Sequence, residues 1–169
     1  MKILSIDPSI TTMGVAILED RKVLKAYTFK TNPKDELEDR VKQIAEHFNS
    51  LQGLAVDVVL IEMPGTFMRR GEYAMKNVKS IQMLMLAIGV IAGTLSQYFD
   101  VQFVSVKEWK GSTKKEVTKM IAESLTDALH NEHERDAYMM AVNWQDLIRF
   151  RKATKPRKID RFIKKDFTD

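Results

Sequence analysis

The chain has 169 residues, a hydrophobic fraction of 44%, a formal net charge of +4 and no cysteine. A chain of this length is most simply one domain with a sizeable core, and the lack of cysteine excludes disulfide scaffolds and thiolate zinc sites. The longest apolar stretch, IQMLMLAIGVIAGTL, is shorter than the roughly twenty residues of a spanning helix, so we expect no membrane partner.

The N-terminal region reads as three short strands. The first two are KILSI and VAIL, with a polar turn between them and Gly14 at its exit, and RKVLKAYTFK follows a Glu19–Asp20 turn. Residues 2–30 are therefore predicted to form an antiparallel meander. The first strand ends in Asp7, which is either a turn-capping residue before Pro8 or a functional group.

The rest of the chain alternates helices with two apolar strands. AVDVVLIE is rich in valine, isoleucine and leucine, as is typical of a strand covered on both faces, and it ends in Glu62. The strand VQFVSV follows later. Helices are expected over residues 33–51, 72–98, 113–129 and 132–150, the third beginning at a Thr113–Glu116 capping box. This order predicts an α/β fold with a mixed sheet and helices on both faces.

The charge of the chain is concentrated at its end. We expect one domain over residues 1–150 and a basic tail over residues 151–169, in which lysine and arginine far outnumber acids. A tail of this density favours a polyanionic partner, nucleic acid ahead of membrane. The alternative is a solvated end without a function.

Four side chains form a candidate metal site. Asp7 and Glu62 end two apolar strands, at the edge where open α/β sheets place their active sites. On the last helix His133 and Asp136 are three residues apart and share one face. Carboxylates with one imidazole suit magnesium or manganese better than zinc or copper.

The spacing leaves the partner of Asp136 open among Glu132, His133 and Glu134. The run NEHERD is also compatible with a solvated helix start, where acids favour the helix dipole. Pairs of divalent ions hydrolyse phosphodiesters in many nucleases. With the basic tail, this ligand set predicts a nuclease with two ions per active site, Mg2+ with Mn2+ able to substitute, and no small-molecule cofactor.

The ordered motifs SIDPSITTMGVAIL, LIEMP, VSVKEWKG and HERDAYMMA resemble the RuvC family of Holliday junction resolvases, over roughly residues 2–145. The resemblance implies an RNase H-like sheet of five strands, three antiparallel and then two parallel. It also implies that Asp7, Glu62, His133 and Asp136 are catalytic and hold the metals. Many family members carry Asp where this chain has His133.

Further roles follow from the same resemblance. Phe67 matches an aromatic residue that wedges into the junction, although it could also be a core residue. The resemblance and the local charge imply DNA contacts by Arg69, Arg70, Lys107, Lys110, Lys114 and Lys115. The resemblance further implies a homodimer through the helix around residues 72–98. We expect a cytoplasmic location in a bacterial or phage-infected cell.

The expected function is cleavage of four-way DNA junctions. The main alternative is an RNase H-like nuclease acting on other branched DNA or on RNA–DNA hybrids, since selectivity lies in loops and dimer geometry. An actin-like kinase would need a second domain, for which the chain leaves no room. A binding module without chemistry is disfavoured because all four candidate ligands are present.

Overall fold

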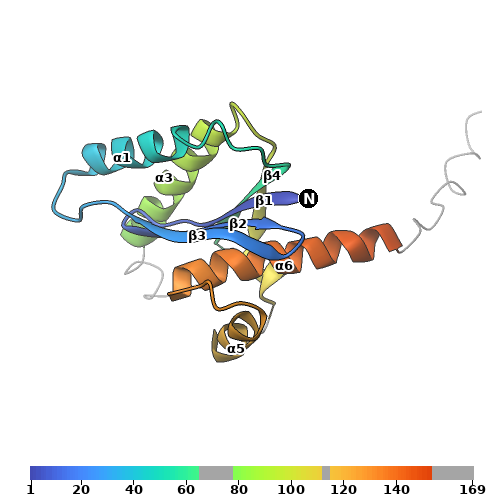
Figure 1. Cartoon of the computed structure of the whole chain (residues 1–169). Helices are drawn as coiled ribbons and strands as arrows, with labels where there is room; N and C mark the ends of the chain where they lie inside the picture. Colours follow the sequence, from blue (N-terminus) through green and yellow to red (C-terminus); the bar gives the residue numbers. More distant parts are fainter. Residues whose placement is uncertain (65–77, 112–114, 154–169) are drawn as a thin grey trace, which may run out of the picture.

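The computed structural model describes residues 1–64, 78–111 and 115–153. Its centre is a five-stranded sheet in the order β3-β2-β1-β4-β5 (Figure 1). The strands are β1 (Lys2–Asp7), β2 (Thr12–Glu19), β3 (Lys22–Lys30), β4 (Val58–Met63) and β5 (Val101–Ser105). The first three pair antiparallel, whereas β4 and β5 join β1 in parallel. The predicted sheet is thus confirmed.

Helices cover both faces of the sheet, as the sequence predicted. Their bounds are α1 (Leu37–Asn49), α3 (Val78–Leu95), α4 (Val106–Trp109), α5 (Lys115–Leu125) and α6 (Glu132–Ala153). In Figure 1, α1 and α3 lie on one side of the sheet and α6 lies on the other, with α5 beyond α6. Helix α6 continues past residue 150, where the sequence predicted the boundary between domain and tail.

Helix α1 starts later than predicted, because local side-chain hydrogen bonds hold the preceding residues in a turn. The Asn32 amide donates to Asp35 at 2.6 Å, and the Lys34 backbone N–H donates to Asn32 Oδ1 at 3.1 Å. Gln43 from within α1 also donates to Asp35 at 2.7 Å. Such bonds compete with helix formation, so the predicted start at residue 33 is wrong.

Helix α4 was not predicted. Its N-terminus carries a complete capping box, in which the Ser105 hydroxyl accepts from the Glu108 N–H and Glu108 accepts from the Ser105 N–H. The capping box that the sequence predicted begins instead at Thr113, which lies outside the described residues. Helix α5 ends at Leu125, earlier than predicted, and the predicted Glu19–Asp20 turn is centred instead on Asp20 and Arg21, both with positive φ.

Strand alternation divides the core into two layers. Leu4 and Ile6 of β1 pack in the layer with α1 and α3, whereas Ile3 packs in the layer with α6. Ser5, on the same face as Ile3, donates a hydrogen bond to α6. Because side chains alternate along a strand, Asp7 continues the α6 face. In β4 the same alternation puts Val58 and Leu60 in the α6 layer, and Glu62 follows them.

Helix α3 is the one described helix that is long and apolar enough, by length and composition alone, to cross a membrane. Its 18 residues have a mean hydropathy of 1.7. Ala87, Ile88, Ile91 and Leu95 are buried in the same core layer as Ile44 and Phe48 of α1. Several other apolar side chains of α3 remain exposed in the single chain.

Candidate active site

Asp7 and Glu62 end neighbouring parallel strands. In the register of β1 and β4, Ile6 pairs with Ile61, so the next residue on each strand is one of the two acids. Both point to the α6 face by the alternation described above. The apolar strands therefore bring two carboxylates to one edge of the sheet, as the sequence predicted.

The first turn of α6 lies directly on this edge. A Cβ atom at Gly14 would lie 1.9 Å from the carbonyl oxygen of His133, so only glycine permits this approach. Gly14 is the β2 partner of Asp7. One turn further along, Ser5 Oγ donates to the Ala137 carbonyl at 2.6 Å. These backbone contacts bring His133 Nδ1 within 2.8 Å of Asp7 Oδ2.

The end of helix α4 connects Glu62 with Asp136. The sequence analysis did not predict this connection. The buried Trp109 donates from Nε1 to Glu62 Oε2 at 2.9 Å. Lys110 Nζ lies 3.6 Å from Asp136 Oδ2 and 5.2 Å from the centroid of the Trp109 ring. Asn143 of α6 donates to the Trp109 carbonyl at 2.8 Å. The sequence signal for this bridge is a Trp between Glu108 and Lys110 in the charged segment KEWKG.

The electrostatics of the site reflect carboxylates gathered away from water. Burial, with the nearby charges of Asp7 and Asp136, raises the pKa of Glu62 from 4.5 to about 7, against the opposing effect of the Trp109 hydrogen bond. Burial also raises the pKa of Asp136, while Lys110 opposes the rise. The hydrogen bond to Asp7 raises the pKa of His133. Glu62 and Asp136 thus hold their protons more tightly than free carboxyl groups do.

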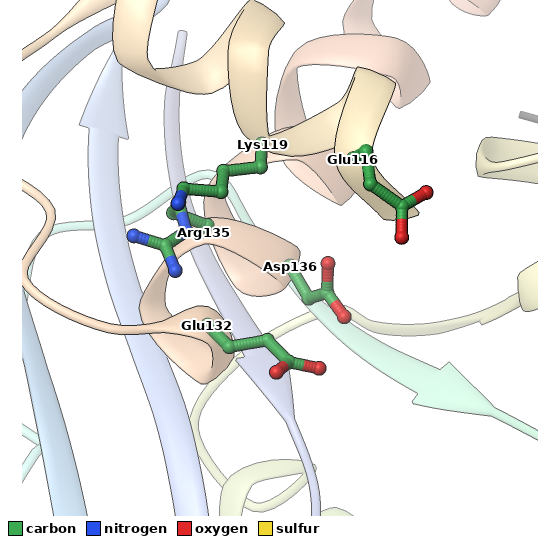
Figure 2. A pocket seen from close by; sticks show the side chains of 5 residues that line it. All are labelled: Glu116, Lys119, Glu132, Arg135 and Asp136. Atoms are coloured by element: carbon green, nitrogen blue, oxygen red, sulfur yellow. The ribbon is translucent and has the colours of Figure 1, made fainter. Parts of the chain in front are cut away.

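A polar cavity of about 280 Å3 opens beside Asp136, between α5 and α6 (Figure 2). Its lining consists of Glu116, Lys119, Glu132, Arg135 and Asp136. Figure 2 shows the carboxylates of Glu132 and Asp136 on the same side of α6. Lys119 and Arg135 both form ion pairs with Glu123. Glu132 is thus half-buried beside the site.

Glu134 corrects the prediction of a solvated helix start. Its exposed fraction is 3%, and it accepts hydrogen bonds from Thr28 and Asn131 side chains and from the His130 backbone N–H. It faces β3, and Glu134 therefore does not face Asp136. Of the other two candidates, Glu132 lines the cavity with Asp136 and His133 contacts Asp7.

The candidate DNA-binding residues are described only in part. Lys107 is exposed on α4, and Lys110 points into the site. Lys115 begins α5, but its side chain is outside the described residues, as are Phe67, Arg69, Arg70 and Lys114.

The donor set fits divalent metal ions. Within the described ranges, no three Asp, Glu or His side chains are arranged to hold a single ion. Instead each of three carboxylates contacts a nitrogen of another side chain. The pairs are Asp7 with His133, Glu62 with Trp109, and Asp136 with Lys110. Three carboxylates and an imidazole match the ligands that magnesium and manganese prefer. The upward pKa shifts show that added positive charge would be favourable here.

Comparisons with known proteins find similar solved structures. No family model matches the chain, and no curated protein sequence matches it. A solved structure of T. thermophilus RuvC in complex with a Holliday junction substrate superposes with a TM-score of 0.72 at 20% identity, covering 89% of this chain and 96% of that chain. A second Thermus thermophilus RuvC structure gives 0.67 at 21% identity with the same coverage. The chain therefore has the RNase H-like fold of these RuvC structures.

Proposed function

We propose that the protein is a structure-selective endonuclease that resolves four-way DNA junctions by hydrolysing phosphodiester bonds. The observation that carries the proposal is the convergence of Asp7, Glu62, His133 and Asp136 on one edge of a RuvC-like sheet. The similar T. thermophilus RuvC was solved with a Holliday junction substrate, which supports the same substrate class for this chain.

The four residues would hold two divalent ions, Mg2+ or Mn2+. When bound, such ions activate water and stabilise the leaving oxygen of an in-line displacement. The three carboxylates would position them, and release of the like-charge repulsion around Glu62 would favour their binding.

The contact with Asp7 orients the imidazole ring of His133. Asp7 engages Nδ1 at 2.8 Å, so the ring would present Nε2 to an ion or to the proton of a water. Either role requires a neutral imidazole. Trp109 and Lys110 would orient Glu62 and Asp136 from the side of α4.

DNA binding would use positive charge around this edge. Lys107 lies exposed near it on α4, and we extend the same role to Arg69, Arg70, Lys110, Lys114, Lys115 and the basic tail, with Phe67 as the junction wedge. Each phosphate contact would add to the salt dependence of binding.

A homodimer would present two such sites to the symmetric strands of a junction. The exposed apolar side chains of α3 support this assembly, since Val78, Ile81, Met85 and Leu86 are each more than one third exposed. A Cβ at Gly89 or Gly93 would meet nothing within 4 Å, so another helix could approach closely there.

The test is a cleavage assay on a synthetic four-way junction, with linear duplex, flapped DNA and RNA–DNA hybrid in parallel. The wild type should cut the junction in Mg2+, and Asp7→Asn, Glu62→Gln and Asp136→Asn should each abolish cutting while junction binding persists. Cutting of the hybrid or flap in preference to the junction would favour the alternative nuclease. Near wild-type cutting by any of the three variants would contradict the metal assignment.

A further inference from the structure

Glu134 is a buried carboxylate with a full set of partners. Its Oε1 accepts from Thr28 Oγ1 at 2.9 Å and from Asn131 Nδ2 at 2.6 Å, and its Oε2 accepts from the His130 N–H at 2.9 Å. Its own N–H donates to Asn131 Oδ1 at 3.1 Å. A buried carboxylate is tolerated only when it is hydrogen-bonded in this way, and removal of one donor leaves an expensive group behind.

This network lies on the same row of the sheet as the candidate site. Thr28 pairs with Gly14 across β3 and β2, and Gly14 pairs with Asp7 across β2 and β1. The first turn of α6 crosses this row: Glu134 contacts Thr28, the His133 carbonyl lies over Gly14, and the His133 ring contacts Asp7.

Consecutive side chains of an α-helix point about 100° apart. Glu134 and His133 can therefore engage β3 and β1 at the same time, and fixing one fixes the rotation of the other. The contact at Gly14 sets the distance between helix and sheet. The Ser5 hydrogen bond to Ala137 holds the helix on β1 one turn further on. Among these contacts, the Glu134–Thr28 hydrogen bond is the one that ties the first turn to β3.

We propose that Glu134, through Thr28 and Asn131, is a positioning residue that sets the rotation of the first turn of α6 and so holds the His133 ring on Asp7. The inference rests on the proposed function for its catalytic consequence. The positioning itself is a property of the folded chain and can be measured without cleavage.

The test compares Thr28→Val with Thr28→Ser. Valine keeps the shape of threonine and removes the hydroxyl, whereas serine keeps the hydroxyl that Glu134 needs. Both leave the charge of the protein unchanged. In the metal-free protein, the imidazole NMR signals of His133 should shift or broaden in Thr28→Val and stay at their wild-type positions in Thr28→Ser. His47, which stacks on Phe29 on the other face of the sheet, is the internal reference.

In junction cleavage, Thr28→Val should lower the rate at saturating substrate on the order of tenfold, with the Kd for the junction unchanged, and Thr28→Ser should remain near wild type. Glu134→Gln should reproduce the His133 shift, because an amide offers only one accepting oxygen. Unchanged His133 signals in both Thr28→Val and Glu134→Gln would overturn the proposal, even if the variants are less stable. A wild type that cuts no junction while the His133 shift occurs would refute the proposed function alone.

Discussion

The two faces of the sheet are built differently. The face covered by α1 and α3 is an apolar layer in which Leu4, Ile6, Val15, Ile44 and Ile91 are buried. The opposite face, under α6, combines an apolar layer with buried polar contacts at Ser5, Glu134 and Trp109 Nε1. The candidate site lies at the edge of this second face.

The α1–α3 face mainly stabilises the fold, whereas the α6 face fixes the positions of the site's side chains. Apolar contacts are non-directional and tolerate small shifts, so the α1–α3 face can hold the sheet together without specifying the position of any one atom. Hydrogen bonds and a backbone contact at glycine are directional and specify distances. The α6 face uses them where side chains from three elements must meet.

The strongest way to break the α6 face is Gly14→Ala. The added methyl group would collide with the His133 backbone at 1.9 Å, and a helix backbone cannot move aside cheaply. We expect at least a hundredfold loss of cleavage and a lower melting temperature. The matched control is Gly53→Ala, where a Cβ meets nothing within 4 Å. Equal, small effects of both variants would show that α6 does not lie on β2 as described.

His133→Ala should cost on the order of a hundredfold in cleavage rate while junction binding persists, which is the scale of general acid–base groups. His133→Asp should retain part of the activity. Because either role of His133 requires a neutral imidazole, kcat/KM of the wild type should fall as pH drops through the range in which His133 gains a proton. His133→Asp should move this acid limb downward, and an unmoved limb would assign it to another group.

Glu62→Gln should stabilise the metal-free protein at high pH. The folded-state pKa of Glu62 is about 7 and its unperturbed value is 4.5, so the folded state binds more protons between these values. Stability should then fall as pH rises from 4.5 to 7 and level off above 7, by about 3 kcal/mol in total. Urea unfolding in a chelator at pH 5 and pH 8 measures this change. The same pH dependence in Glu62→Gln and wild type would contradict the assignment.

Trp109→Phe tests one hydrogen bond within the α6 face, because phenylalanine keeps an apolar ring and removes the hydrogen bond to Glu62. Loss of one bond to a charged acceptor predicts roughly a tenfold slower cleavage. Trp144→Phe is the control, since Trp144 packs beside the same core layer and lies eight residues beyond Asp136 on α6. Similar rates for the two variants would remove Trp109 from the site.

The smallest effect is expected on the apolar face. Ile91→Val should cost about 1 kcal/mol of stability through the lost methylene and its cavity. The rate of junction cleavage should not change, because no directional contact depends on Ile91. Denaturant unfolding and the cleavage assay together provide the check, and a loss of rate comparable to that of Trp109→Phe would show that the two faces are coupled.

Much of the fold was decided by local sequence. Alternating or continuous apolar runs predicted all five strands and their order along the chain, because strands of this composition must be buried. The parallel pairing of the last two strands was implied by the RuvC resemblance. Strand-end acids at Asp7 and Glu62 could be recognised for the same reason, as each interrupts an apolar run. The sharing of one helix face by His133 and Asp136 follows from helical periodicity alone.

The roles of Gly14, Trp109 and Glu134 were decided only by tertiary structure. Glycine in a strand, tryptophan in a lysine-rich segment and glutamate in a charged helix start each have ordinary local explanations. Their partners are distant in sequence, as with Thr28 and Glu134 or Glu62 and Trp109. Local patterns report which residues can be buried, but a hydrogen bond between two elements depends on the register and rotation in which they pack, and these exist only in the assembled fold.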